Sequence, residues 1–367
     1  MSIRFDSDPR IVMTLDAGGT NLKYTAIRGN RLLVGPISVP TEADNLERCL
    51  GNIVHGFERI KESLPAPPAA ISFAFPGPAD YPKGIVDNDN NLPAFRGGVA
   101  LGPMLEEKFK IPVFLNNDGD LFAYGESIAG FLPYVNDLLE KSGSPKRYRN
   151  LFGITLGTGF GGGIVAGGEL LLGDNSAGGE AWLLRNKLDP RMNAEEGVSI
   201  RAARRVYAEL CGIPAAEAPE PKVLFDIGMG KAHGNQDAAR EAFRRIGEVA
   251  GDAVAQAITL VDALVVVGGG ISHASSLILP AIVDAMNDSF PREGNPLRRL
   301  IQKVFNIEDA KQRDAFLRGA AKELKIPGST KKIAYDPLQR TAVGLSRLGT
   351  SEAVGIGAYA YALNRLG

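Results

Sequence analysis

Short apolar runs alternate with longer helical stripes over the first third of the chain. Residues 70–75 are apolar or small, the pattern of a buried strand, and the Pro-Gly-Pro breaker at 76–78 ends that run. Between residues 46 and 60, apolar side chains recur at the spacing of a helix with one buried face. A further strand, 112–115, turns through polar residues into a helix that ends near residue 128. This alternation predicts an α/β domain.

The second part of the chain shows the same kinds of pattern. Residues 133–150 are rich in polar side chains and are interpreted as a polar excursion. An apolar stripe at helical spacing follows from about 237 to 260, and the apolar strand 263–267 comes directly after it. The closing stretch, about 352–365, is a helix rich in small residues, which we expect to pack back on the first domain.

Two domains are the default for 367 residues, because a single hydrophobic core rarely grows that large. We expect an N-terminal domain over residues 1–127, completed by the closing helix at about 350–367. The C-terminal domain would span residues 128–349. Within it, the basic segment 293–332 is predicted to be a helical insertion whose charges form a solvated face rather than a docking surface.

Two glycine-rich turns, each set between short apolar strands, carry the clearest chemical signal. The first spans residues 15–21 and the second spans residues 155–163, about 140 residues later. Glycine lets backbone N–H groups come close to an anion, and threonine adds a hydroxyl donor. One such turn is weak evidence, but two of them indicate a device that holds one polyphosphate from both sides. The candidate phosphate-binding residues are Gly18, Gly19, Thr20, Gly157, Thr158 and Gly159.

A third glycine motif follows the strand 263–267 and consists of Gly268, Gly269 and Gly270. A strand that delivers glycines to a helix is a favoured place for a nucleotide to lie against backbone. A close-packed turn between strand and helix would need the same residues. From this motif alone, the two interpretations have equal weight.

Composition and charge argue against several classes of protein. Lys and Arg number 41 against 42 Asp and Glu, so nothing indicates nucleic acid or an anionic membrane as the main partner. Two cysteines make a disulfide framework or a cysteine-based zinc site unexpected. No apolar run reaches about 18 residues and the N-terminus lacks a signal-peptide core, so we expect a cytoplasmic protein. The three scattered histidines do not fit a hydrolase triad.

Two aspartates that follow buried strands are candidates for chemistry. Asp16 could hold Mg²⁺ beside phosphates bound by the first turn, although capping its own turn is an equally ordinary role. Asp118 opens a helix, where it could act as the general base for a sugar hydroxyl that attacks a γ-phosphate. Local sequence alone favours a helix cap for Asp118. The two glycine turns favour the catalytic interpretation of both residues.

Glutamates near the second turn add further carboxylates. Glu180 follows Gly178-Gly179, and Glu195 follows Ala194. Carboxylates accept hydrogen bonds from hydroxyl groups at fixed positions, which suits a polyhydroxyl ligand. A solvated glutamate is the ordinary alternative for each.

Taken in order, these motifs resemble the ROK family of sugar kinases and sugar-responsive repressors, within the actin/hexokinase/Hsp70 ATPase superfamily. The resemblance covers nearly the whole chain; each motif is weak alone, and their order is specific. The matching segments are the phosphate motifs 16–20 and 155–163, the sugar-side loops 75–79 and 91–93, the connecting pair Asn117-Asp118, the adenosine motif 267–270 and the closing segment 355–358.

The resemblance implies an α/β fold of two actin-like, ribonuclease H-like domains with a cleft that closes on ATP and sugar. Asp118 would be the general base, and Asp16 would organise Mg²⁺ with the ATP. The implied hexose contacts are Gly77, Asn91, Asn117, Asp118, Glu180 and Glu195. Positioning and electrostatic stabilisation would supply most of the catalysis.

The chain departs from the family pattern in two places. Family kinases usually continue Gly-Glu-x-Gly-His, but here Glu180 is followed by Ala181-Trp182-Leu183, so the histidine is missing. The family's zinc segment with three closely spaced cysteines is also missing, because residues 189–196 contain no cysteine. We therefore expect no zinc site. The residues ahead of residue 10 leave no room for a helix-turn-helix domain, so a repressor is not expected.

The expected function is that of an ATP- and Mg²⁺-dependent, ROK-type sugar kinase for a hexose or an amino-hexose. Its expected partners are a sugar and ATP, without nucleic acid or membrane, and a homo-oligomer is left open. A non-catalytic sugar or nucleotide sensor with the same fold is the alternative. The missing histidine and zinc site favour that alternative, and the retained Asp16 and Asp118 oppose it. An actin-like structural or chaperone ATPase would have no use for the sugar-side loops.

Overall fold

The computed structural model describes residues 5–18, 20–87 and 93–367. The chain forms two compact units. The first comprises Met1–Gly130, Gly163–Gly179 and Leu348–Gly367, and the second comprises Phe131–Gly162 and Glu180–Arg347. No helix in the described part of the chain is long and apolar enough to cross a membrane.

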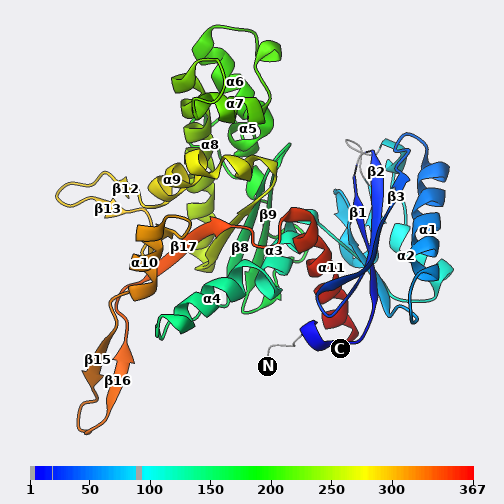
Figure 1. Cartoon of the computed structure of the whole chain (residues 1–367), viewed down its shortest axis with the longest axis horizontal. Helices are drawn as coiled ribbons and strands as arrows, with labels where there is room; N and C mark the ends of the chain where they lie inside the picture. Colours follow the sequence, from blue (N-terminus) through cyan, green and yellow to red (C-terminus); the bar gives the residue numbers. More distant parts are fainter. Residues whose placement is uncertain (1–4, 19, 88–92) are drawn as a thin grey trace. The chain divides into compact units, whose positions relative to one another are not determined.

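A five-stranded sheet forms the centre of the first unit, with strand order β3-β2-β1-β4-β7 (Figure 1). The first three strands are antiparallel neighbours, whereas β4 and β7 run parallel to β1. The strands are β1 Val12–Ala17, β2 Asn21–Arg28, β3 Arg31–Pro40, β4 Ala70–Ala74 and β7 Val113–Asn116, and a separate small ladder joins β5 Ala79–Asp80 to β6 Ile85–Val86.

Four α-helices lie in the described residues of this unit: α1 Leu46–Glu62, α2 Leu101–Phe109, α3 Asp118–Ile128 and α11 Thr350–Leu366. Figure 1 shows α1 and α11 on opposite sides of the sheet. The buried stripe of α1 includes Ile53 and Phe57, and the Phe57 ring meets Tyr24 of β2 edge-on at 5.1 Å between ring centroids. The helix α11 packs on α3 and on β1 and β4. The closing helix therefore belongs to the first unit.

A second sheet has the strand order β10-β9-β8-β11-β17-β14, in which β8, β11, β17 and β14 are parallel. Its central strands are buried over almost their whole length, which explains their near-continuous apolar sequences. The strands are β8 Leu151–Leu156, β9 Phe160–Ala166, β10 Glu169–Leu170, β11 Leu264–Gly268, β14 Lys303–Asn306 and β17 Arg340–Leu345.

Two helices of the second unit, α9 Ser275–Met286 and α10 Ala310–Arg318, pack against β14 and β17 of this sheet. The longest helix, α8, runs from Gln236 to Val261, and the Asn235 side chain caps it by accepting a hydrogen bond from the Ala238 N–H. The helix expected at 237–260 is thereby confirmed. The others are α4 Phe131–Lys141, α5 Glu195–Val198, α6 Ile200–Cys211 and α7 Pro221–Gly228. The 3₁₀ turns among the residues that the structure describes are η1 Phe5–Ser7, η2 Tyr81–Lys83, η3 Pro93–Phe95, η4 Ala181–Leu183, η5 Ala215–Glu217 and η6 Gly270–Ala274.

The basic segment 293–332 differs from the helical insertion that the sequence predicted. Only α10 within it is an α-helix, and the rest contributes strands. Val304 and Phe305 of β14 are buried at the edge of the second sheet, and a Pro-Gly turn at 327–328 separates two exposed strands. Two hairpins result, β12 Ser289–Phe290 with β13 Leu297–Arg298 and β15 Lys322–Lys325 with β16 Lys332–Tyr335.

Candidate active site

Three parallel strands of the first unit end level with one another and carry the polar residues of the site. In the register of the sheet, Asp16 lies opposite Ala74 of β4, and Ala74 lies opposite Asn116 of β7. The segments that leave these strand ends, 75–77 and 117–118, therefore emerge at the same edge as Asp16. The carboxyl ends of parallel strands are where α/β proteins commonly bind ligands.

A pocket of about 370 Å³ opens at this edge of the first unit. Residues at the ends of β1 and β4 and at the starts of α3 and α11 line it. Asp16, Gly77 and Asp118, which the sequence singled out separately, line the same pocket. The other lining residues are Ala17, Ala74, Phe75, Pro76, Thr350, Ser351 and Val354. We call it the Asp118 pocket.

Asp118 occupies the first turn of α3, and Asn117 is the cap of that helix. The Gly119 N–H donates to Asn117 Oδ1 at 2.7 Å and to Asp118 Oδ1 at 2.9 Å. The protein packed around the Asp118 carboxyl raises its pKa. Hydrogen bonds from the backbone N–H groups of Gly119 and of Asp118 itself lower this pKa, and the negative charge of Asp16 raises it. The Asp118 side chain is nevertheless exposed to solvent, which limits the size of the rise. The local geometry combines the cap with a carboxylate that can accept a proton.

Asp16 presents an exposed carboxylate at the mouth of the same pocket. The Ser351 hydroxyl of α11 lies 3.4 Å from Asp16 Oδ2. In the described ranges, no group of three or more His, Cys, Asp or Glu side chains could hold a metal ion. Mg²⁺ is usually bound by one or two carboxylates together with substrate phosphates, so a solvent-open aspartate fits that ion.

The first glycine turn is fixed by Thr41, a residue that the sequence did not single out. Thr41 is 2% exposed; its hydroxyl donates to the Gly18 carbonyl at 2.6 Å, and its N–H donates to the Thr20 carbonyl at 3.0 Å. A Cβ at Gly18 would lie 2.8 Å from the Asn21 carbonyl oxygen, so the turn needs glycine there. Gly19 lies outside the described residues, as does Asn91 of the predicted sugar-side loop.

The second glycine turn is held by a carboxylate. Glu195 Oε2 accepts a hydrogen bond from the Phe160 N–H at 3.1 Å, and a Cβ at Gly159 would lie 2.7 Å from that oxygen. Arg201 Nη2 pairs with Glu195 Oε1 at 3.3 Å, and its Nη1 lies 3.4 Å from the Thr158 carbonyl oxygen. Glu195, expected from the sequence to contact substrate, thus lies beside the turn. Arg201 is a second residue that sequence reasoning missed.

The third glycine motif lies at the same edge of the second sheet as the second glycine turn, because Gly268 of β11 is opposite Thr155 of β8. Gly269 has φ +85°, and a Cβ there would lie 2.6 Å from the backbone nitrogen of Leu156. That crowding supports the close-packed interpretation for Gly269. A Cβ at Gly270 or Gly157 would meet no atom within 4 Å, so both of these glycines border open space.

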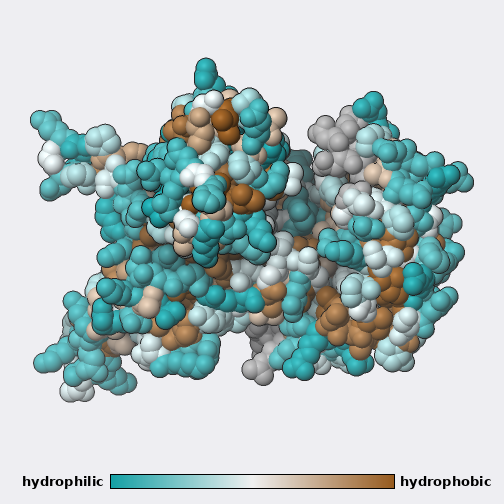
Figure 2. Space-filling model, turned by 45° about the horizontal axis from the view of Figure 1, so that its top comes forward, coloured by the Kyte–Doolittle hydropathy of each residue, from teal (hydrophilic) through white to brown (hydrophobic). Residues whose placement is uncertain are grey.

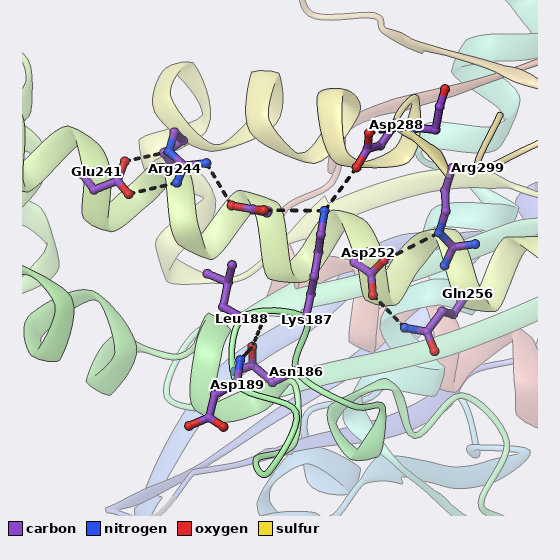
Figure 3. Close-up of polar contacts among 12 residues, drawn as sticks. Asn186, Lys187, Leu188, Asp189, Glu241, Arg244, Asp252, Gln256, Asp288 and Arg299 are labelled. Atoms are coloured by element: carbon purple, nitrogen blue, oxygen red, sulfur yellow. Dashed lines mark hydrogen bonds and ion pairs between the residues drawn. The ribbon is translucent and has the colours of Figure 1, made fainter. Parts of the chain in front are cut away.

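The segment that follows Glu180 is held by side-chain contacts. The Trp182 Nε1–H donates to Glu180 Oε2. Further along, Asn186 is buried, and its Oδ1 accepts from the N–H groups of Leu188 at 2.9 Å and Asp189 at 3.3 Å (Figure 3). Glu180 therefore accepts a hydrogen bond from Trp182. Trp182 belongs to the segment in which family kinases usually have the histidine.

Ion pairs tie the same segment to neighbouring helices. Lys187 Nζ lies 3.5 Å from Glu248 Oε1 of α8 and 3.4 Å from Asp288 Oδ2 after α9. Arg244 continues this chain of charges from Glu248 to Glu241 along α8, as Figure 3 shows. Hydrogen bonds and ion pairs thus hold the segment in which the family's zinc cysteines are missing. The absence of zinc itself remains a prediction.

Comparisons with known proteins agree on one family. The sequence pattern of the ROK family matches residues 12–182. The crystal structure of a glucokinase from Parabacteroides distasonis has 52% sequence identity and a TM-score of 0.90, and the match covers 99% of each chain. The N-acetyl-D-glucosamine kinase of Vibrio parahaemolyticus is 28% identical over 276 residues, which are 70% of this chain and 83% of that protein.

More distant structures share the fold. A ROK hexokinase from Thermus thermophilus has a TM-score of 0.67 at 22% identity, with 97% of this chain and 100% of that chain covered. A ROK family glucokinase from Streptomyces griseus, solved with glucose and AMPPNP, has a TM-score of 0.62 at 20% identity, with the same coverage. The chain belongs to the ROK family, and it is a sugar kinase with the actin-like two-domain fold.

Proposed function

We propose that this chain transfers the γ-phosphoryl group of ATP to a hydroxyl of a hexose or an amino-hexose. The names of its relatives support the substrate class, since they include a glucokinase at 52% identity and an N-acetyl-D-glucosamine kinase. The complex of the Streptomyces griseus glucokinase with glucose and AMPPNP supports ATP as the donor. The observation that carries the proposal is the convergence of Asp16, Gly77 and Asp118 on one pocket.

In the proposed reaction, Asp118 takes the proton of the attacking sugar hydroxyl. The hydroxyl oxygen forms a bond to the γ-phosphorus as the bond from that phosphorus to the β-γ bridging oxygen breaks, and ADP leaves with the electron pair. The raised pKa of Asp118 suits this role, because a carboxylate with a higher pKa is a stronger base than an ordinary aspartate.

The remaining candidate residues have binding roles in this proposal. Asp16 would hold Mg²⁺, which neutralises phosphate charge when bound. The phosphates would lie against the backbone of two glycine turns, and the adenosine against the third glycine motif. The proposed phosphate and nucleotide residues are Gly18, Gly19, Thr20, Gly157, Thr158, Gly159, Gly268, Gly269 and Gly270. The proposed sugar contacts are Gly77, Asn91, Asn117, Glu180 and Glu195.

The variant Asp118→Asn tests the base. It keeps the size and the capping geometry but loses the ability to accept a proton, so we expect kcat to fall at least about a hundredfold. ADP release would be measured against a panel of hexoses and amino-hexoses, and nucleotide affinity by calorimetry. The same chemical change at the exposed Asp44 is the matched control and should leave both quantities unchanged.

The panel also separates the kinase from a non-catalytic sensor. The contact of Trp182 with Glu180, where the family histidine is missing, is the observation that favours a sensor. A sensor would bind a sugar of the panel measurably and release no ADP with any of them. A parent rate in Asp118→Asn would remove Asp118 from the role of base and leave the sugar-kinase assignment in place.

A further inference from the structure

One short segment of the second unit lies against the second glycine turn. Residues 195–201, which comprise α5 and the start of α6, contact the backbone of that turn. The Ile200 N–H donates to the Gly157 carbonyl at 2.9 Å, and Arg201 Nη1 lies 3.4 Å from the Thr158 carbonyl oxygen. A Cβ at Gly157 would meet no atom within 4 Å. The turn is therefore held from one side and borders open space on another.

Arg201 joins this turn to Glu195. Its Nη2 lies 3.3 Å from Glu195 Oε1 and 2.9 Å from Glu196 Oε1, while its Nη1 reaches the Thr158 carbonyl. The other oxygen of Glu195 accepts the hydrogen bond from the Phe160 N–H. A carboxylate proposed to bind the sugar and a turn proposed to bind phosphates thus meet at a single guanidinium group.

The contacts of Arg201 are too exposed to contribute much to the stability of the fold. The Arg201 side chain is 54% exposed, and that of Glu196 is 37% exposed. Figure 2 turns the end of the second unit that carries α6 and α7 forward, and this surface is mostly hydrophilic with apolar residues among the polar ones. Water and salt screen ion pairs on such a surface, so they contribute little to the free energy of unfolding.

The surroundings of Arg201 also argue against direct binding of phosphate. Both of its terminal nitrogens already face protein oxygens, which belong to two carboxylates and one carbonyl. The negative charges of Glu195 and Glu196 would repel a phosphate group at the same place. The planar guanidinium instead suits the task of holding several oxygens in one fixed arrangement.

This arrangement links the order of one site to the order of the other. A sugar hydroxyl that donates to Glu195 would restrict the motion of that carboxylate and, through Arg201, the motion of the turn. A ligand that binds an already ordered site loses less conformational entropy than one that must order it. Sugar and nucleotide should therefore each strengthen the binding of the other, by the same factor.

We propose that Arg201 is a positioning residue that couples the sugar site to the nucleotide site. It holds the Glu195 carboxylate and the Thr158 carbonyl together, so the second glycine turn binds phosphate more tightly when a sugar holds Glu195. The inference rests on the proposed function, in which Glu195 contacts the sugar and the turn contacts the phosphates. All of these residues belong to the second unit.

Titration calorimetry with AMPPNP and Mg²⁺, without sugar and with a saturating sugar, tests the coupling. The sugar is the member of the hexose and amino-hexose panel that binds most tightly. In the parent protein, the sugar should lower the Kd for AMPPNP at least about fivefold. In Arg201→Gln this coupling factor should fall below about twofold, while the Kd measured without sugar stays within about threefold of the parent value. An unchanged melting temperature would show that the variant is folded.

Arg204→Gln is the matched control, because it makes the same chemical change in the same helix. Arg204 pairs with Glu220 at 3.0 Å and donates to the carbonyls of Ala216 and Ala218. These contacts are of the same kinds as those of Arg201, but they reach segment 216–220 and not the turn. The variant should keep the parent coupling factor within about twofold.

Two results would overturn the inference and leave the proposed function in place. The first is a parent protein that phosphorylates a sugar but binds AMPPNP equally well with and without it. The second is a parent coupling factor that persists in Arg201→Gln. If AMPPNP affinity also falls equally with and without sugar in that variant, Arg201 binds the phosphate itself. A protein that binds no sugar of the panel would instead overturn the proposed function, and this inference with it.

Discussion

At the scale of single residues, the protonation of Asp118 should set the acidic limit of activity. The carboxyl must be deprotonated to act as a base, and both the surrounding protein and Asp16 raise its pKa. Activity should therefore be lost as the pH falls through this raised pKa, at a pH above the value of about 3.9 for an ordinary aspartate. The measurement is kcat/KM for the sugar against pH, with circular dichroism to check folding. A fall of kcat/KM on the acidic side with a pKa at or below about 3.9 would contradict the assignment of Asp118 as the base.

Thr41 should act on nucleotide binding through the first glycine turn. The variant Thr41→Val keeps the shape of the side chain but loses the hydrogen bond to the Gly18 carbonyl, while the backbone bond to Thr20 stays possible. A loosened turn should raise the KM for ATP several-fold with a smaller change in kcat. Thr41→Ser retains the hydroxyl and should restore most of the affinity. Equal KM values for Thr41→Val and the parent protein would show that the turn is rigid without this bond.

Sequence reasoning found the residues that stand at strand ends but missed those that hold them. Asp16 and Asp118 each follow an apolar strand, so their position at a sheet edge could be predicted from pattern alone. Thr41 and Arg201 act through hydrogen bonds to the backbone carbonyls of Gly18 and Thr158, which are distant from them in sequence. These contacts form only because folding brings distant segments together, and no local sequence motif identifies Thr41 or Arg201.

At the scale of elements, close helix packing gives a direct test of two glycines. In α3, a Cβ at Gly125 would collide with the backbone carbonyl of Ala353 in α11, whereas a Cβ at Gly51 in α1 would meet no atom within 4 Å. We expect Gly125→Ala to lower the free energy of unfolding by at least about 2 kcal/mol. Gly51→Ala should raise it by about 0.5–1 kcal/mol, because alanine favours a helix.

Urea denaturation of the two variants beside the parent protein measures both effects. The pair is matched, since each change adds one methyl group to the interior of a helix in the first unit. A Gly125→Ala variant as stable as the parent would mean that α3 and α11 can separate at little cost.

Elements with strong periodicity could be predicted, and those set by tertiary contacts could not. The apolar stripe of α8 is long and regular, so the helix predicted at about 237–260 has nearly the observed limits. Residues 133–150 were interpreted as a polar excursion, but α4 occupies Phe131–Lys141, because Phe131, Val135 and Leu139 form a buried face among the polar residues. In the basic segment, lysines at every few positions suggested a helix, whereas the Pro-Gly turn at 327–328 produces a hairpin.

At the scale of the whole molecule, the order of weak motifs along the chain carried the family assignment. Each glycine turn alone is compatible with many folds. Their order, together with the Asn117-Asp118 pair, resembled one family. The pattern of that family matches residues 12–182, and a glucokinase structure of 52% identity matches 99% of the chain. The path of segment 184–196 could not be predicted, because the zinc-binding cysteines that usually define it are missing and pairwise contacts such as those of Asn186 hold it.

The purified protein should contain no stoichiometric zinc, and a chelator should not lower its melting temperature. The segment 184–196 is already closed by the buried Asn186 and by the ion pairs of Lys187. Metal analysis by mass spectrometry and a thermal scan with and without EDTA make the measurement. One zinc per chain, with a melting temperature lowered by EDTA, would refute the prediction.

The contact between Trp182 and Glu180 also gives the protein an optical reporter of its own. Trp182 is the sole tryptophan of the chain, and its indole N–H donates to a carboxylate proposed to bind the sugar. Indole emission responds to the charge and hydration of its surroundings, so a sugar hydroxyl that competes for Glu180 should shift the emission wavelength. The sugar that this enzyme recognises could then be identified by direct titration, before any turnover is measured and without a label.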